Sequence, residues 1–206
     1  MQMLVSVILA LATTGAVNNP NPWVKKHTTD NGITVYMRDV PNSKIKEAKA
    51  VGIIKSSPKR LRDVIRDVPH YIEFMPYIEE AKVLKHIDDK TCIVYQRLNP
   101  PIVNRRDMVY RFVEFHDKFT NFYKLSWTRA DGIGPAPMKK VVRLKVNDGH
   151  WTLEDMKNGA TRVTYWVYTD PGGSLPAWIA NKANSSSLPD LINAVRNRSA
   201  NPKWKR

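Results

Sequence analysis

The chain has a single cysteine, Cys92, among its 206 residues. One thiol cannot form an intramolecular disulfide, and it excludes both a Cys-x-x-Cys zinc motif and a paired redox site. The five histidines show no His-x-x-x-His spacing and no nucleophile elbow, and the nine glycines form no phosphate-binding loop. The sequence therefore predicts no metal site, no cofactor and no catalytic set.

Charged side chains are absent from residues 1–22. The apolar run 3–16, MLVSVILALATTGA, is shorter than the ~20 residues that a membrane-spanning helix needs. It ends in small residues, which is typical of a secretory signal, although the opening MQ lacks the usual positive charge. We predict a signal peptide over 1–16, a proline-broken linker over 17–22 and export to the periplasm or the exterior. A retained membrane anchor or a mis-assigned start, and hence a membrane-anchored or cytoplasmic protein, is the alternative.

Acidic residues are few: 33 Lys and Arg stand against 19 Asp and Glu, a net charge of +14. Such an excess favours an anionic partner, namely a membrane surface, a nucleic acid or an acidic ligand, or it serves solubility alone. No nucleic-acid recognition motif accompanies it, so we expect no nucleic-acid partner. The 42% hydrophobic content indicates one globular domain.

Residue patterns in the first half of the chain predict a hairpin and a helix. Alternating apolar residues predict paired strands over 33–40 and 44–54. The preceding segment, 23–32, is expected to begin with a short helix. Ser57 as N-cap and Pro58 at the first helical position predict that a longer helix starts there.

The second half is dominated by strand patterns. Short runs between residues 79 and 168 are rich in β-branched and aromatic residues, and turn signals such as Asp148-Gly149 separate them. An apolar stripe over 175–198, interrupted by Pro189, predicts one kinked helix or two abutting helices. We therefore predict an α+β fold, in which a curved antiparallel sheet of about nine strands wraps around the C-terminal helix.

The strand that begins NRRDMVYRF raises the question of a buried cation. Strand parity places Arg106 on the same face as Met108, Tyr110 and Phe112. If this aromatic face points inward, Arg106 needs an anionic partner, because a guanidinium keeps its charge when buried. That partner is either a carboxylate of the protein or the phosphate or carboxylate of a ligand.

Further aromatic and aliphatic side chains share strand faces in the same way: Tyr123, Leu125 and Trp127, and, after the irregular stretch 130–140, Val142, Leu144 and Val146. Such rings either fill a core, line a site for acyl chains, or stack on a quaternary ammonium headgroup.

The segments NRRDMVYR and YTDPGGSLPAWIAN…LPDLINAVR resemble the START (StAR-related lipid-transfer) domain family, in particular its phosphatidylcholine transfer protein branch. The similarity covers 23–198 in the family's order. It implies the helix-grip fold, with a tunnel for one lipid between the sheet and the C-terminal helix. Arg106 matches the arginine of the family's Arg-Asp motif, which contacts the lipid phosphate in phosphatidylcholine binders. Trp178 matches the aromatic position near the start of the gating helix.

We therefore expect a lipid carrier or sensor rather than an enzyme, with a START-like domain over 23–198 and a basic tail over 199–206. It would hold a phospholipid, sterol or fatty acid, act as a monomer, and exchange its lipid at anionic membranes through basic residues in 55–66, 139–145 and 196–206. The alternative is a helix-grip enzyme of the cyclase or hydrolase type that uses the same cavity. The candidate ligand-binding residues are Arg106, Tyr110, Phe112, Tyr123, Trp127, Leu144, Tyr165, Trp178 and Ile179.

Overall fold

A computed structural model describes residues 21–101, 103–130, 132–202 and 204 of the chain. The predicted signal peptide, 1–16, and all but the last two residues of the predicted linker lie outside the described residues. The strands are β1 Val24–Thr28, β2 Thr34–Arg38, β3 Glu47–Ile54, β4 Ile78–His86, β5 Thr91–Leu98, β6 Arg105–Asp117, β7 Phe122–Arg129, β8 Val141–Arg143, β9 Val146–Asp155 and β10 Thr161–Asp170. The helices are α1 Pro58–Arg66, α2 Tyr71–Phe74, α3 Ala177–Ser186 and α4 Leu188–Ala200, with a 3-10 turn over Val68–His70.

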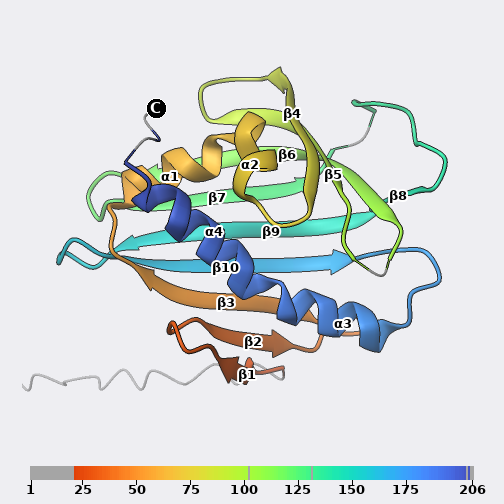
Figure 1. Cartoon of the computed structure of the whole chain (residues 1–206), viewed down its shortest axis with the longest axis horizontal. Coiled ribbons are helices and arrows are strands. Elements are labelled where there is room, and N and C mark those ends of the chain that lie inside the picture. The colour runs from red at the N-terminus through yellow and green to blue at the C-terminus, as the bar shows by residue number, and fades with distance from the viewer. Residues whose placement is uncertain (1–20, 102, 131, 203, 205–206) are drawn as a thin grey trace, which may run out of the picture.

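All strands of the described part belong to one curved sheet, and the helices lie on its inner face (Figure 1). Its order is β1-β2-β3-β10-β9-β7-β6-β5-β4 with antiparallel neighbours, and the short β8 pairs with β6 in parallel. Helix α4 crosses β10 and β3, and α1 lies on the same face over β9 and β7 (Figure 1). The α+β prediction is confirmed, with ten strands among the described residues rather than about nine.

The predicted start of α1 is confirmed in detail. Ser57 has an extended backbone, and its side-chain oxygen accepts a hydrogen bond from the N–H of Arg60 at 3.2 Å. Pro58 occupies the first turn, where no intrahelical N–H donor is needed. The helix buries Leu61 and Ile65 against the core, so cap and apolar stripe act together.

The C-terminal stripe forms two abutting helices, which was one of the two predicted alternatives. Helix α4 buries Leu188, Ile192 and Val195, and Pro189 lies in its first turn. Helix α3 buries Ala180 instead of the predicted stripe, and the side chain of Trp178 is 69% exposed.

Two local predictions are wrong. Residues 24–28 form the edge strand β1 rather than the start of a helix, because they pair with β2. Asp148-Gly149 is no turn but part of β9. A Cβ atom at Gly149 would lie 2.2 Å from Cζ2 of Trp127, so glycine allows this indole to lie flat against the strand.

The core is divided by the sheet into a large inner cluster and a small outer one. The outer cluster consists of Ile93, Tyr95 and Val109, with Ala130 and Met138 from the stretch 130–140 packed against it. Trp204 belongs to the inner cluster and is 8% exposed. Packing against the core therefore continues to Trp204, beyond the expected boundary at 198.

Candidate functional site

Arg106 lies at the start of β6 with its side chain on the inner face. It is 8% exposed, and its strand neighbours are Leu98 on β5 and Val142 on β8. The guanidinium donates to two backbone carbonyls, that of Asn104 through Nη1 and that of Pro171 through Nε at 3.4 Å. No carboxylate of the described residues lies within ion-pair distance of Arg106, and burial lowers its pKa. Within the described part of the chain, this buried cation is thus balanced by carbonyl dipoles alone.

The adjacent carboxylate does not neutralise Arg106, because strand parity turns it to the outer face. Asp107 is fully buried and accepts two hydrogen bonds from Arg143, at 2.7 and 2.9 Å, and one from the Tyr95 hydroxyl at 3.3 Å. These bonds fix β8 beside β6 and raise the pKa of Arg143. Asp107 therefore holds β8 against β6, the strand that carries Arg106.

An aromatic cluster lies farther along the inner face. The ring centroid of Trp127 is 6.5 Å from that of Tyr110 and 5.5 Å from that of Tyr165, and Trp151 lies 4.6 Å from Tyr165. Tyr110, Trp127 and Tyr165 were predicted as site residues by strand parity, and the structure brings them together. Trp151 was not among the predicted site residues, although its strand faces the same side as Trp127 and Tyr165.

Tyr165 lies on the inner face of β10 and is partly exposed. Burial raises the pKa of its hydroxyl well above the ordinary value. Burial likewise raises the pKa of Tyr110, with smaller effects of Tyr71, Cys92 and Tyr165, so these groups lie close to one another.

Gln96 is a site residue that the sequence analysis missed. It is 7% exposed on the inner face of β5, where its strand partner is Met108. Its amide makes no hydrogen bond with any described residue. The signal was present in TCIVYQRL, since parity places one amide in an otherwise apolar row with Cys92, Val94 and Leu98.

The other predicted residues are spread more widely. Phe112 and Leu144 are buried in the inner cluster. Tyr123 lies near the far end of β6, stacked on His116 with centroids 3.9 Å apart, and the structure does not bring it to Arg106. Trp178 points to solvent and does not line the interior, while Ile179 beside it is half-buried.

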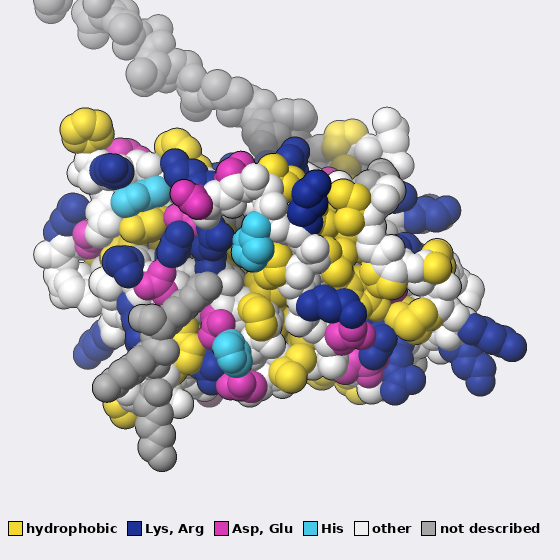
Figure 2. All heavy atoms as spheres, turned by 90° about the horizontal axis from the view of Figure 1, so that it is seen from above, with side chains coloured by type: hydrophobic (Ala, Val, Ile, Leu, Met, Phe, Trp, Pro, Cys, Tyr) yellow, Lys and Arg dark blue, Asp and Glu magenta, His cyan; other side chains and the backbone are white. Residues whose placement is uncertain are grey.

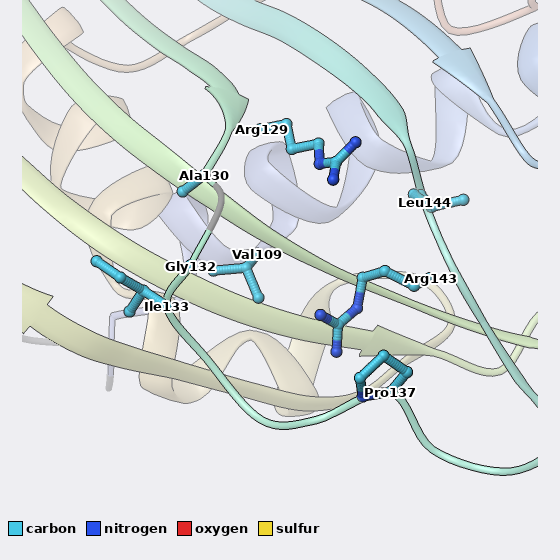
Figure 3. A pocket seen from close by; sticks show the side chains of 8 residues that line it. All are labelled: Val109, Arg129, Ala130, Gly132, Ile133, Pro137, Arg143 and Leu144. Carbon is cyan, nitrogen blue, oxygen red and sulfur yellow. The ribbon is translucent and has the colours of Figure 1, made fainter.

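A separate pocket of about 250 Å³ lies beneath the stretch 130–140 (Figure 3). The lining includes Arg129, Arg143, Val109 and Ile133. One of its two arginines, Arg143, is bound by the carboxylate of Asp107. Among the described residues, no group of three or more His, Cys, Asp or Glu side chains is placed to hold a metal ion. No helix in the described part is long and apolar enough to cross a membrane.

Comparison with known proteins gives this site a family. The sequence profile of the START domain matches residues 8–205. The chain belongs to the START domain family. An uncharacterized protein of Pseudomonas aeruginosa is 29% identical over 198 residues, which is 93% of this chain and 96% of that protein. Mouse phosphatidylcholine transfer protein is 27% identical over 177 residues, 81% of either chain.

A solved structure agrees with the sequence relatives. The STAR-related lipid transfer protein of Xanthomonas axonopodis superimposes with a TM-score of 0.79 at 26% identity, over 87% of this chain and 99% of that one. The resemblance found from the sequence is thereby confirmed. As a START domain, the chain is related to lipid-binding and lipid-transfer proteins, and lipid is its general class of partner.

Proposed function

We propose that this START domain is a non-enzymatic lipid carrier that holds one lipid between the inner face of its sheet and helices α3 and α4. The observation that carries the proposal is Arg106, a buried cation on an apolar face whose partners among the described residues are carbonyl groups. A lipid phosphate or carboxylate supplies the missing full negative charge. Guanidinium binds such groups through two parallel hydrogen bonds, which are stronger than bonds to a neutral carbonyl.

The interior beside Arg106 suits acyl chains. Met108, Leu144 and Trp127 are buried there, and Tyr165 is partly exposed. Hydrocarbon gains about 25 cal/mol for each Å² removed from water, so such a lining favours tails over solvent.

Exchange at membranes is proposed for the end of the molecule that holds α3 and β8 (Figure 1). Trp178 is exposed there, and Lys139, Lys140 and Lys145 are exposed before and after β8. Figure 2 shows Lys and Arg side chains at the same right-hand end, with hydrophobic side chains between them. Each well-placed cation adds ~1 kcal/mol of attraction to anionic lipid.

The basic residues of α1 contribute less to this surface than the sequence suggested. Arg62 and Arg66 form ion pairs with the buried carboxylate of Glu114, with N–O distances of 2.8 Å. The positive charge of Arg62 and Arg66 is therefore largely neutralised by Glu114. The 139–145 region and α3 are the proposed membrane-facing elements.

The proposal is tested by phospholipid transfer between vesicles with Arg106→Leu and a matched control. Removing one charge-assisted interaction lowers affinity by about 10- to 100-fold, so transfer should fall by that order. Arg105→Leu is the control, because the neighbouring Arg105 is exposed and paired with Glu79 at 3.0 Å. Wild-type transfer by Arg106→Leu would contradict the proposal, whereas Arg105→Leu should stay within about twofold.

Two further properties are proposed with the carrier role. The lipid should be recovered chemically unchanged after transfer, which separates a carrier from a helix-grip enzyme. We also propose that the protein is exported and monomeric. Cell fractionation with N-terminal sequencing, and light scattering of the purified protein, test these two points.

A further inference from the structure

Besides Arg106, three polar side chains that have no hydrogen-bond partner among the described residues lie on the inner face. Gln96 is 7% and Tyr110 5% exposed, and Tyr165 is partly exposed. Neither the amide of Gln96 nor the two tyrosine hydroxyls makes a hydrogen bond with a described residue. We call Gln96, Tyr110 and Tyr165 the interior polar set.

Unpartnered polar groups are the exception on this inner face. The hydroxyl of Tyr71, close to Tyr110, donates to the carbonyl of Ile65. The amide of Asn147 donates to Sδ of Met108 at 2.8 Å and accepts from Thr169 at 2.6 Å. Because buried polar groups are nearly always hydrogen-bonded, the free members of the set indicate where a ligand's polar atoms belong.

The strand register arranges the set as a track that starts at Arg106. Leu98 lies opposite Arg106, Gln96 opposite Met108 and Val94 opposite Tyr110. Gln96 is therefore one diagonal step from Arg106, roughly 7–8 Å between Cα atoms, and one such step from Tyr110. The indole of Trp127 then connects Tyr110 to Tyr165, with centroid distances of 6.5 and 5.5 Å.

We propose that the interior polar set recognises the part of a lipid headgroup beyond its phosphate, and that this part carries O–H or N–H donors. The inference rests on the proposed carrier function. The phosphate lies at Arg106, the amide nitrogen of Gln96 donates to it, and the carbonyl oxygen of Gln96 accepts from the headgroup. The hydroxyls of Tyr110 and Tyr165 complete the set, and the faces of Trp127 and the tyrosines add attraction for a cation.

Hydrogen-bond chemistry separates the candidate headgroups. A hydrocarbon tail placed here would leave all three polar groups unsatisfied. A trimethylammonium group would stack on the rings but offers no N–H to Gln96. A hydroxyl or a primary ammonium satisfies the set, and a site built for such donors rejects an analogue that lacks them.

The test uses the full-length protein and vesicles that contain equimolar dioleoyl phosphatidylethanolamine, phosphatidylglycerol, phosphatidylcholine and phosphatidic acid. Native mass spectrometry then measures which lipid occupies the protein. We expect the occupancy by the ethanolamine or the glycerol lipid to exceed that by either of the other two lipids by about tenfold. A preference for the ethanolamine lipid indicates an ammonium donor, and a preference for the glycerol lipid indicates a hydroxyl donor. Preference for the choline lipid or phosphatidic acid, or equal occupancy of all four, would overturn the inference and leave the carrier function standing. Absence of any bound lipid would overturn the carrier function as well.

Variants separate recognition from structure. Gln96→Leu, Tyr110→Phe and Tyr165→Phe should each reduce the preference by about 2- to 10-fold. The thermal midpoint of the lipid-free protein should not fall in these variants, because none of the three polar groups makes a hydrogen bond with a described residue. Tyr77→Phe, at a tyrosine that is 44% exposed, is the matched control and should change neither quantity. A lowered midpoint with an unchanged lipid preference would assign the set to structure alone and overturn the inference.

Discussion

At the scale of single residues, strand parity predicted the strand face of several site residues. It predicted from the sequence that Arg106 and Tyr110 share one face of their strand, and the structure turns this face inward. The same parity would have found Gln96. Parity placed Tyr123 on the same face as Leu125 and Trp127, which the structure buries, but it did not give its distance from Arg106, and it says nothing of Trp178 on helix α3. Their positions are set by tertiary contacts that a local pattern does not contain.

His150 provides a prediction about pH at the residue scale. Its ring stacks on Trp166 with centroids 5.0 Å apart, and burial, with a smaller effect of Lys124, lowers its pKa to about 4. In the unfolded chain the pKa is about 6.5, so between pH 6.5 and 4 the unfolded state binds a proton that the folded state does not. The free energy of unfolding should therefore fall by roughly 1–3 kcal/mol as pH drops through this window, and stay flat above it.

Urea unfolding at several pH values checks this prediction. The His150→Gln variant should lose most of the slope, whereas a change at the exposed His86 should keep it. Equal slopes in wild type and His150→Gln would show that the proton is bound elsewhere.

At the scale of elements, the sequence predicted which segments are strands better than where they end. The strand expected to carry Val142, Leu144 and Val146 divides into β8 and the start of β9. The division follows from Asp107, whose carboxylate holds Arg143 and whose carbonyl accepts the N–H of Leu144 at 2.9 Å. Gly149 was misinterpreted for a similar reason, since the ring that requires a glycine there comes from another strand. Contacts between segments far apart in the sequence fixed both boundaries.

Helix α3 is held to the sheet mainly through polar contacts, which predicts how it opens. Asn181 accepts the N–H of Lys46 at 2.9 Å and donates to the carbonyl of Lys44 at 3.0 Å. Asn181→Ala removes both bonds, so α3 should open more often and vesicle-to-vesicle transfer should be about 3- to 10-fold faster. Ser186→Ala, at an exposed and uncharged residue of the same helix, is the control. Slower or unchanged transfer by Asn181→Ala would show that α3 does not limit exchange.

At the scale of the whole molecule, the C-terminal residues close the domain. The indole N–H of Trp204 donates to Asp67 at 3.0 Å, and Arg60 lies 4.1 Å above the ring and donates to the Trp204 carbonyl at 2.7 Å. These contacts tie the end of α4 to α1 and the turn after it. From the sequence this segment was only a run of basic residues, because nothing local indicates the pocket into which a tryptophan folds back.

Truncation tests the structural role of Trp204. Removing residues 202–206 should lower the free energy of unfolding by about 2–4 kcal/mol, because a buried indole and its hydrogen bond are lost. Removing only residues 205 and 206 retains Trp204 and should cost little. Urea midpoints of the two truncated proteins measure the difference, and equal midpoints would contradict the role given to Trp204.

Native mass spectrometry of the full-length protein, incubated with phospholipid vesicles and recovered without detergent, tests the central claim most directly. The claim is that Arg106 and the interior hold one lipid. The expected result is a single lipid mass on the wild-type protein, greatly reduced in Arg106→Leu and retained in Arg105→Leu. A wild-type protein that carries no lipid, or an Arg106→Leu variant loaded as fully as wild type, would contradict it.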